Sequence, residues 1–450
     1  MPELIRELYT MRDYPAMSHP SSDPAVCATA ALLGGLAVPP PSAARFLEIG
    51  CGSGHNLIPL AMRWPQGRFT GMDLSGRAIG LARDLASTAH AENIEFHVAD
   101  LRGFAPPNGI WDYIIAHGFF SWVPDDIKTA LFTFCRDNLS PAGIATISFN
   151  LECGWLPRFP VIEKARAIQQ AGKVDEMTAL SVLRSVTPHE SPEISIIDDM
   201  LAKGPDILPF DDFAPINDPW PLDRFVRAAA NAGLRCLGES DPGQNLPQGL
   251  DAPTLENLRR QSADPLSFLI AADAAAARTF RTLVLCRDDA PVKNLHPKEQ
   301  VTPLFVKKKP KTPLGNLGIP RLPDAIRHES VAVEELLEMT DRDRPLAVLR
   351  ILDGIREGWL LPRIEPVRYD LEPPDFPKLN PFRLECARRG LPLVDAWHSP
   401  CTFPERHFEI LAMMDGSRSR KDLATISAGH VPELSFRPWL QHIAARGMFA

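Results

Sequence analysis

Three glycines at alternate positions are the most informative group of residues in this 450-residue chain. Glu48 precedes them, and Gly50, Gly52 and Gly54 complete the spacing E-x-G-x-G-x-G. Glycines placed this closely let the backbone turn sharply and lie against a ligand where a Cβ atom would clash. The spacing differs from the G-x-G-x-x-G of dinucleotide-binding loops. We therefore expect a backbone cradle for a small ligand that is bound in a different way.

Two aspartates follow the glycines at the ends of further apolar runs. Asp73 ends the run 68–73, and Asp100 comes directly after the run 94–98. A carboxylate at the position of Asp73 can accept hydrogen bonds from both hydroxyls of a ribose, as in the related dinucleotide-binding folds. The order of glycines, first aspartate and second aspartate therefore favours a ligand that contains a nucleoside.

The elements that must position these residues are short strands alternating with helices. Strands are expected at 45–49, 68–73, 94–98, 111–116 and 143–149. Helices are expected at 24–36, 55–64, 76–88 and 124–138. Such alternation predicts an α/β fold with a doubly wound, Rossmann-like parallel sheet.

The alternation stops after Asn150 and resumes later in the chain. Residues 158–206 have a helical pattern, a helix and strand follow at 221–239, and another strand is expected at 280–286. We predict an N-terminal arm or cap at 1–40 and one domain at 41–287. That domain would contain a helical insert at 151–210 and a regulatory or substrate region at 205–287. An insert after the fifth strand leaves the carboxyl edge of the sheet, where ligands bind, and is placed to act as a lid.

The rest of the chain is predicted to hold a linker and smaller modules. Residues 288–327 are rich in proline and lysine and lack periodicity, which is typical of a linker. Within it, the run 307–311 is either a solvated stretch or a basic patch. Residues 328–450 are expected to form helical modules, and 328–365 and 404–450 share a faint pattern that favours a winged-helix-like pair.

The amino-acid composition and net charge indicate which classes of binding partner to expect. The net charge is -8, with 45% apolar and 23% charged residues. This balance disfavours a nucleic-acid partner, which needs a basic surface, and suits a cationic substrate. The eight cysteines are scattered without metal-ligand spacing, so we expect reduced thiols, no metal site and a cytoplasmic location. Neither a signal peptide nor a membrane span is expected.

The glycine loop and the two aspartates together resemble the motifs of class I S-adenosyl-L-methionine (SAM) methyltransferases. The resemblance implies that Asp73 binds the ribose, that Asp100 meets the adenine amine and that Leu101 packs on the adenine ring. Amide groups at the helix start after the loop would face the carboxylate of SAM. The product would be S-adenosyl-L-homocysteine. The implied donor-binding residues are Glu48, Gly50, Gly52, Gly54, Asn56, Asp73, Leu74, Asp100, Leu101, His117 and His19.

A second stretch narrows the family. The residues after the fourth strand, 117–124, read His-Gly-Phe-Phe-Ser-Trp-Val-Pro. They resemble a signature of bacterial methyltransferases with a methyltransferase regulatory domain, among them the rickettsial protein-lysine methyltransferases that act on outer-membrane proteins. Ser18-His19-Pro20 and Gly154-Trp155 also match that family. The resemblance implies acceptor-side, catalytic positions at His117, Phe120 and Trp122.

Three positions depart from the family pattern. Phe120 stands for a tyrosine, Glu152-Cys153 for Tyr-Pro, and Asp211-Asp212 for His-Glu. These positions lie where an acceptor would be contacted, so the departures bear on the identity of the substrate.

Individual residues also have simpler structural interpretations. His117 is either an acceptor-side base or a hydrogen-bonding partner of the backbone below SAM. Trp122 stacks on adenine, holds a cation by cation–π attraction, or packs in a strand-to-helix turn. His19 either covers the cofactor from the N-terminal arm or caps local structure.

Three functions remain open from the sequence. The first is methylation of lysine nitrogen in a protein or peptide. The second is methylation of a small molecule, natural product or peptide precursor. The third is a regulator that binds SAM without turnover. A homodimer is a further expectation.

Overall fold

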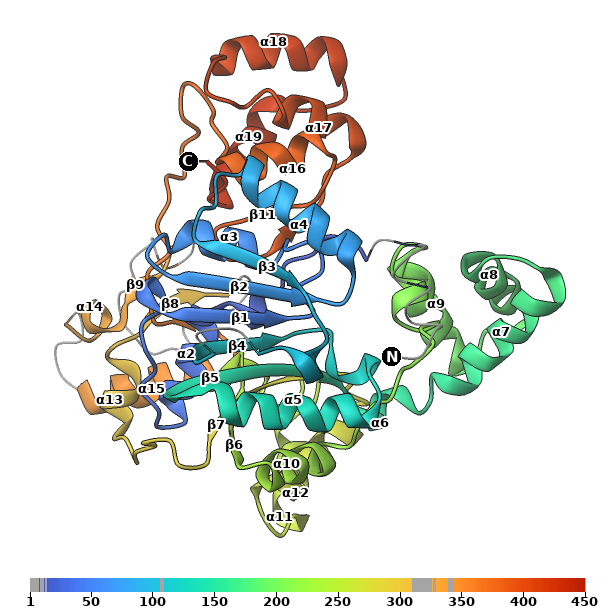
Figure 1. The fold of residues 1–450 in the computed structure, drawn as a ribbon, viewed down its shortest axis with the longest axis vertical. Helices are drawn as coiled ribbons and strands as arrows, with labels where there is room; N and C mark the ends of the chain where they lie inside the picture. The colour runs from blue at the N-terminus through green and yellow to red at the C-terminus, as the bar shows by residue number, and fades with distance from the viewer. Residues whose placement is uncertain are drawn as a thin grey trace.

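The computed structural model describes residues 8, 12, 14–105, 109–309, 326, 329–338 and 344–449. A seven-stranded sheet with the order β3-β2-β1-β4-β5-β7-β6 forms its centre (Figure 1). The strands are β1 (Arg45–Ile49), β2 (Arg68–Asp73), β3 (Ile94–Val98), β4 (Trp111–Ala116), β5 (Leu139–Asn150), β6 (Leu234–Glu239) and β7 (Phe280–Arg287).

The first five strands are parallel and the last two form an antiparallel edge. In β1, Glu48 lies opposite Gly71 of β2 and Ile115 of β4. β7 runs antiparallel to both β5 and β6. The predicted α/β, Rossmann-like fold is therefore confirmed, and the parallel strands direct their carboxyl ends to one edge of the sheet.

Helices cover both faces of this sheet because its central strands are apolar on both sides. Phe46 packs with helices α2 (Pro24–Leu33), α3 (Leu57–Arg63) and α4 (Gly76–Thr88) on one face. Its neighbour Leu47 packs with α5 (Asp125–Asn138) and α10 (Leu222–Asn231) on the other. Successive side chains of a strand point to opposite faces, so this alternation produces two cores.

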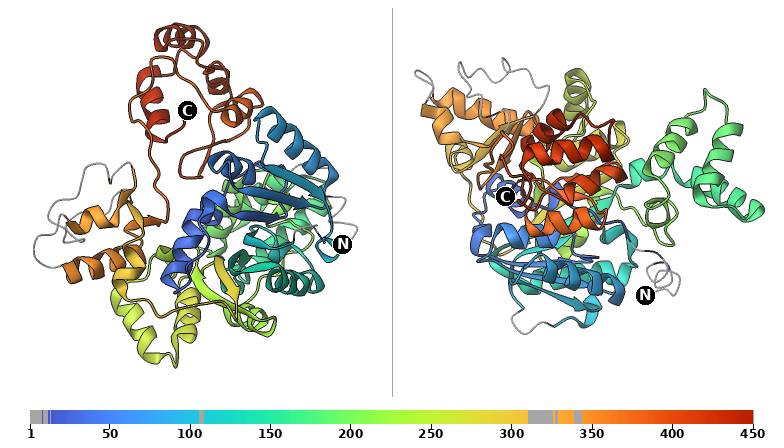
Figure 2. Two further views of the ribbon diagram at one scale, coloured as in Figure 1. Left: turned by 60° about the vertical axis from the view of Figure 1, so that its left-hand side comes forward. Right: turned by 90° about the horizontal axis from the view of Figure 1, so that it is seen from above.

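A helical arm follows β5, as expected. It contains α6 (Glu152–Trp155), α7 (Phe159–Gly172), α8 (Glu176–Val186) and α9 (Glu193–Lys203), and it projects from the body of the molecule (Figures 1 and 2). Trp155, Val161, Leu180 and Ile197 belong to its own small core. Two more helices, α11 (Ala252–Gln261) and α12 (Pro265–Ala275), lie in the chain between β6 and β7.

Part of the segment predicted as a linker is folded. After α13 (Pro297–Val301), β8 (Phe305–Lys308) pairs with β10 (Leu360–Arg363) and β9 (Val331–Ala332) in a three-stranded sheet. Helices α14 (Val333–Glu338) and α15 (Arg344–Arg356) complete this unit. Lys307 lies 4.0 Å from the ring centre of Trp397, and burial lowers its pKa to about 8. Lys307 is therefore packed rather than solvated, whereas 310 and 311 of the lysine-rich run lie outside the described residues.

The C-terminal module stands next to the face of the sheet that carries α3 and α4 (Figure 2). It consists of α16 (Pro381–Arg388), β11 (Leu393–Val394), β12 (Pro400–Cys401), α17 (Glu405–Leu411), α18 (Arg420–His430) and α19 (Phe436–Ala445). Its apolar residues join the core that contains α3, so the module is packed on the sheet domain.

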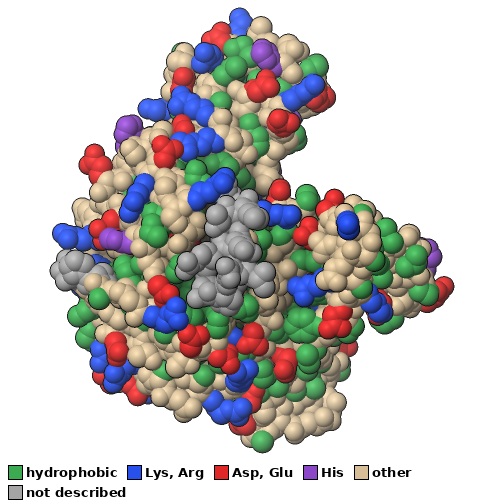
Figure 3. Space-filling view, turned by 45° about the vertical axis from the view of Figure 1, so that its right-hand side comes forward, with side chains coloured by type: hydrophobic (Ala, Val, Ile, Leu, Met, Phe, Trp, Pro, Cys, Tyr) green, Lys and Arg blue, Asp and Glu red, His purple; other side chains and the backbone are tan. Residues whose placement is uncertain are grey.

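Neither a charged patch nor a hydrophobic patch dominates the face drawn in Figure 3. Basic and acidic side chains are interspersed over that face. All eight cysteines are free thiols. Within the described ranges, no helix has the length and apolar character needed to cross a bilayer.

Candidate active site

The glycine loop lies at the carboxyl edge of the sheet, directly after β1. Gly50, Gly52 and Gly54 all have positive φ values, +74°, +52° and +73°. A Cβ atom on Gly54 would lie 2.8 Å from Cζ of Phe96, whereas one on Gly52 would meet no described heavy atom within 4 Å. Gly54 is therefore required for packing as well as conformation. Gly52 exposes its backbone to open space, as a ligand cradle requires.

Glu48 is buried beneath this loop and only half of its carboxylate is paired. Its Oε1 accepts a 2.7 Å hydrogen bond from the Nδ2 of Asn56. Its Oε2 is buried without a hydrogen-bond partner among the described residues. Burial, followed by the nearby charge of Asp73, raises the pKa of Glu48 to about 8. A cationic hydrogen-bond donor at Oε2 would relieve both the lost hydration and the missing bond.

Asp73 ties the glycine loop to the end of β2. Its Oδ2 accepts from the backbone N–H of Gly52 at 3.0 Å, and its Oδ1 accepts from that of Ser75 at 2.8 Å. Burial raises its pKa, while the backbone hydrogen bonds act in the opposite direction. Each oxygen can accept a second hydrogen bond, so the carboxylate can still bind a diol. Leu74, the next residue, is half-buried.

Asp100 is engaged by a neighbouring arginine. Its two oxygens accept from Arg102, with Nη2 at 2.6 Å and Nε at 3.0 Å. These hydrogen bonds lower the pKa of Asp100 to about 2. Arg102 also reaches the carboxylate of Asp126 at 3.1 Å. The side chain of Leu101 is almost fully buried in the core shared with α5. Neither residue is thus free in the way that contact with adenine implies.

The N-terminal arm lies on the glycine loop and brings two histidines together. The backbone N–H of His19 donates to Oδ1 of Asn56 at 2.9 Å, and Oγ of Ser22 donates to the carbonyl of His19 at 2.8 Å. The rings of His19 and His117 are stacked, with centres 3.8 Å apart and planes 20° apart. Oγ of Ser21 lies 3.3 Å from Nε2 of His117. His19 is therefore held beside Asn56 and His117 as part of a hydrogen-bonded network.

Both histidines are neutral at physiological pH. Burial lowers the pKa of His19 to about 4. Burial, and then the neighbouring His19, hold the pKa of His117 well below its ordinary value of 6.5. Nδ1 of His117 has no hydrogen-bond partner in the described part of the chain. The two rings can form hydrogen bonds to a reactant, but their lowered pKa values make them weak bases.

The two predicted acceptor-side aromatics lie in packed surroundings. Phe120 has no exposed surface and packs edge-on against Trp220 and Phe225 at 4.9 and 5.1 Å between ring centres. Trp122 packs edge-on against Trp155 at 6.2 Å, at the root of the helical arm. For Phe120 the arrangement is that of a core residue. For Trp122 it matches the packing alternative.

The aspartates that replace His-Glu are paired inside the protein. Nζ of Lys203 lies 2.7 Å from both Asp211 and Asp212, and 5.4 Å from the ring centre of Trp155. Arg158 also pairs with the fully buried Asp212, at 2.9 Å. These carboxylates therefore fix the helical arm to the following segment.

Several site residues carry no signal that sequence reasoning used. Ser21 and Ser22 adjoin the His-Pro motif, which would have been a local hint. Phe280 begins the antiparallel β7, and its ring centre lies 5.6 Å from that of His117. His398, from the C-terminal module, places Nε2 2.8 Å from Oδ1 of Asn56. Nothing in the spacing of the chain could have linked His398 to the glycine loop.

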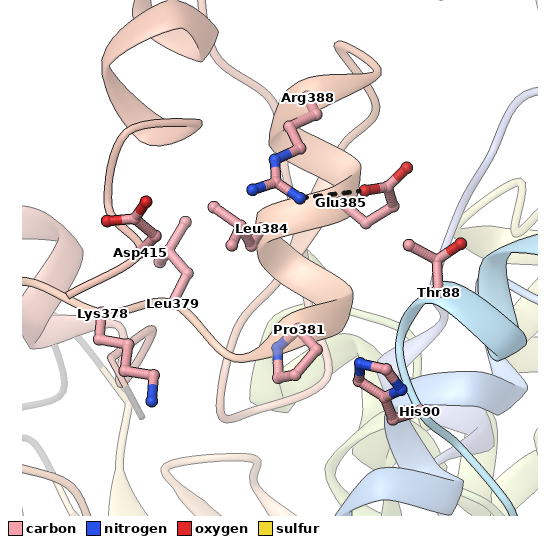
Figure 4. Close-up of a pocket in the computed structure, with 9 residues that line it drawn as sticks. All are labelled: Thr88, His90, Lys378, Leu379, Pro381, Leu384, Glu385, Arg388 and Asp415. Carbon is pink, nitrogen blue, oxygen red and sulfur yellow. Dashed lines mark ion pairs between the residues drawn. The ribbon is translucent and has the colours of Figure 1, made fainter. Parts of the chain in front are cut away.

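A pocket elsewhere in the molecule is remote from this chemistry. It has a volume of about 220 Å³ and lies between the end of α4 and α16, where Arg388 and Glu385 form an ion pair of 3.6 Å (Figure 4). Thr88, the last residue of α4, and the nearby His90 stand at the opposite end of this 13-residue helix from Asp73. At 1.5 Å per residue, that is about 20 Å. In the described ranges, no group of three or more histidine, cysteine or acidic residues could hold a metal ion.

Comparisons with known proteins agree with this geometry. Residues 46–143 match a family described as a methyltransferase domain, and 205–287 match one described as a predicted methyltransferase regulatory domain. An uncharacterized protein of Rickettsia prowazekii is 30% identical over 288 residues, which cover 61% of this chain and 52% of that protein. A trans-aconitate 2-methyltransferase of Azoarcus is 36% identical over 110 residues, covering 24% of this chain and 40% of that protein.

The chain thus spans about half the length of the first curated relatives that it matches. The structure of PKMT2 from Rickettsia typhi in complex with AdoHcy has a TM-score of 0.82 and 18% identity, covering 97% of this chain and 99% of that one. That likeness concerns the fold. The two matched families confirm the resemblance read from the sequence: residues 46–143 resemble a methyltransferase domain and residues 205–287 a predicted methyltransferase regulatory domain. Almost the whole chain shares its fold with a protein solved in complex with AdoHcy.

Proposed function

We propose that this protein transfers the methyl group of SAM to a nucleophilic acceptor, and that the acceptor is a lysine side chain of a protein or peptide. The observation that carries the proposal is the donor network at the carboxyl edge of the sheet. There, a buried, half-paired Glu48 is hydrogen-bonded to Asn56, and Asp73 accepts the backbone N–H of the open Gly52 while keeping capacity for a further donor at each oxygen. The matched methyltransferase domain spans these residues.

The residues of this network fit the chemical groups of SAM. Oε2 of Glu48 suits the ammonium group of the methionine part, because it lacks a donor and its burial favours a cationic partner. Asp73 suits the ribose hydroxyls. Asp100 suits the adenine amine once its hydrogen bonds to Arg102 are released. The bound sulfonium supplies an already activated methyl group.

The remaining task of the chain is to place a nucleophile and keep it unprotonated. A free lysine has a pKa of about 10.4, and burial disfavours its charged form. The neutral His117 can accept a hydrogen bond from the amine and so orient its lone pair. Correct placement accounts for a large part of such rate enhancements. On this view His117 is an orienting group, and the lysine ammonium loses its proton to solvent water before the resulting neutral amine attacks the methyl group.

Three observations support a polypeptide acceptor. The sequence motifs after β4 resemble those of protein-lysine methyltransferases. The helical arm α7–α9 projects from the body and offers surface beyond the needs of a small substrate (Figure 1). The net charge of -8 favours a basic partner. A homodimer and a cytoplasmic location remain predictions.

A small-molecule acceptor is the second candidate. It is favoured by curated relatives named trans-aconitate 2-methyltransferase, one of which is 36% identical to this chain over 110 residues. It is also favoured by the replacements at Phe120 and at Asp211-Asp212, because these remove polar groups of the family from the acceptor side or pair them internally.

Labelled SAM distinguishes the candidates. The full chain is incubated with methyl-labelled SAM, a panel of bacterial proteins and, separately, a metabolite extract, with Asp73→Ala as the control. We expect label on lysine residues of protein, detected by mass spectrometry. Label confined to small molecules would replace the lysine proposal by the second candidate. Binding of S-adenosyl-L-homocysteine without any turnover would favour a regulator.

A further inference from the structure

The C-terminal module contacts the donor site itself. Three side chains that directly follow the glycine loop or end its helix α3 each meet this module or the segment leading to it. The contacts are His55 Nε2 to Pro392 O at 2.6 Å, Arg63 Nη2 to Ala396 O at 3.2 Å, and Trp64 Nε1 to Glu365 Oε2 at 2.6 Å. Helix α3, which follows the glycine loop, is therefore hydrogen-bonded at both ends to residues more than 300 positions away in the chain.

Buried ion pairs lie next to these contacts. Asp23, at the start of α2, accepts hydrogen bonds from Arg63 and from Arg363, each at 2.7 Å. Asp23 and Arg363 are almost completely buried. Arg363 belongs to β10, so loss of this contact would remove one of the two cationic partners of the buried Asp23 carboxylate, which is strongly unfavourable. The N-terminal arm, α3 and β10 thus meet at one fixed junction.

His398 extends this junction into the glycine loop. It is fully buried, and its Nε2 lies 2.8 Å from Oδ1 of Asn56. The backbone N–H of His19 also donates to this Oδ1, which identifies the atom as the amide oxygen. An amide oxygen only accepts, so Nε2 of His398 is the donor. Burial lowers the pKa of His398 to about 3, consistent with a neutral ring that has one N–H.

The backbone around His398 is shaped to deliver this bond. His398 has φ of +62°, in the left-handed region that non-glycine residues rarely adopt. Oδ1 of Asp395 accepts the backbone N–H groups of Trp397 and Ser399, both at 2.9 Å, and so encloses the turn. A conformation of this kind persists only where its surroundings impose it.

The fixed orientation of the Asn56 amide in turn determines which of its atoms faces Glu48. With its oxygen held by His398 and His19, the amide directs Nδ2 to Oε1 of Glu48 at 2.7 Å and to Oγ of Ser22 at 3.0 Å. This bond occupies one oxygen of the carboxylate and leaves Oε2 for another donor. If the amide turned over, its oxygen would face the carboxylate.

We propose that His398 is a positioning residue of the donor site, and that the C-terminal module is thereby an integral part of SAM binding. His398 holds the Asn56 amide in the orientation that presents Glu48 to the ammonium group of SAM. The inference rests on the proposed SAM-binding function and adds a residue that lies 342 positions from its partner.

The test measures binding of S-adenosyl-L-homocysteine to the full chain by calorimetry. His398→Leu keeps much of the side-chain volume and removes the donor, and we expect the dissociation constant to rise about tenfold or more. His398→Gln restores an N–H donor and is expected to recover most of the affinity. The matched control is Glu365→Ala, which removes a contact of Trp64 at the same interface without touching Asn56.

Several results would overturn the inference. One is equal loss of affinity in His398→Leu and Glu365→Ala, since it would show a merely structural contact. Others are unchanged affinity in His398→Leu or failure of His398→Gln to rescue. If His398→Leu does not fold, His398→Gln and the double variant with Asn56→Ala decide by whether their effects are coupled. Failure of the unaltered protein to bind S-adenosyl-L-homocysteine would instead reject the proposed function.

Discussion

The donor side and the acceptor side of this site are built in opposite ways. On the donor side, Glu48 and Asp73 retain bonding capacity that a ligand can use, while the glycine loop stays open at Gly52. On the acceptor side, Phe120 is enclosed by aromatic rings, and Asp211 and Asp212 are occupied by Lys203. The comparison teaches that the donor is specified by preformed groups, whereas the acceptor depends on what the surrounding surface admits.

The largest expected effect is on the donor side, at Asp73. Asp73→Ala removes the proposed diol acceptor and frees the N–H of Gly52, so we expect at least about 100-fold weaker binding of S-adenosyl-L-homocysteine by calorimetry. The exposed Asp137→Ala serves as the control and should bind normally. Near-normal binding by Asp73→Ala would show that Asp73 does not bind the donor.

The second-largest effect is expected for a substitution of His117, which should affect catalysis at the acceptor side without affecting binding at the donor side. Because its pKa lies well below 6.5, His117 does not titrate between pH 6.5 and 8.5. We expect His117→Gln to lower kcat by about 10- to 100-fold, less than loss of a strong general base can cost, with an unchanged pH profile over that range. Affinity for S-adenosyl-L-homocysteine should change by less than about threefold. A much larger loss of affinity would move His117 to the donor side.

Glu48 gives a pH-dependent effect in the ligand-free protein. Its pKa is raised to about 8 from an ordinary value of 4.5, so between these values the folded state binds more protons than the unfolded state. Its contribution to stability is complete below about pH 4.5 and is lost as the pH rises toward 8. Glu48→Gln should therefore gain stability relative to the unaltered protein as pH rises from 5 to 8.

Urea unfolding of both proteins at several pH values measures this difference. The buried histidines His19, His55 and His398, whose pKa values are lowered, impose the opposite trend on both proteins and cancel in the comparison. Parallel stability curves would show that Glu48 is ionised in the free protein.

The smallest expected effect concerns the competition at Asp100. Arg102→Ala removes the internal partner, and we expect binding of S-adenosyl-L-homocysteine to tighten by about two- to fivefold, since exposed ion pairs contribute little. The affinity of Arg102→Lys, which keeps the positive charge, should lie between those of the unaltered protein and Arg102→Ala. Weaker binding by Arg102→Ala would mean that the arginine assists the donor instead of competing with it.

Much of the donor side could be predicted because its signals are local. The glycine spacing, the apolar runs and the acidic residue at the end of β2 each occupy a few neighbouring positions. Parallel strands then bring their carboxyl ends to one edge without further information. The fold prediction succeeded for the same reason, since successive apolar residues such as Phe46 and Leu47 in β1 require a core on each face of the sheet.

The acceptor side could not be predicted in this way. Phe120 follows a strand whose end faces the site, yet its ring turns into the core beside Phe225. A sequence pattern places a residue near an edge, but the direction of its side chain depends on what packs around it. Likewise, the proline-rich segment after β7 lacks periodicity, although β8 within it finds two partner strands.

The sequence by itself determined the sheet, the glycine loop and the class of donor, because each rests on residues close together in the chain. Only the tertiary structure decided the pairing of Asp100 with Arg102 and the bond from His398 to Asn56. The physical reason is that side-chain hydrogen bonds need no particular separation along the chain. A buried amide and a buried imidazole 342 residues apart meet because two packed modules bring them together where a buried imidazole N–H needs an acceptor.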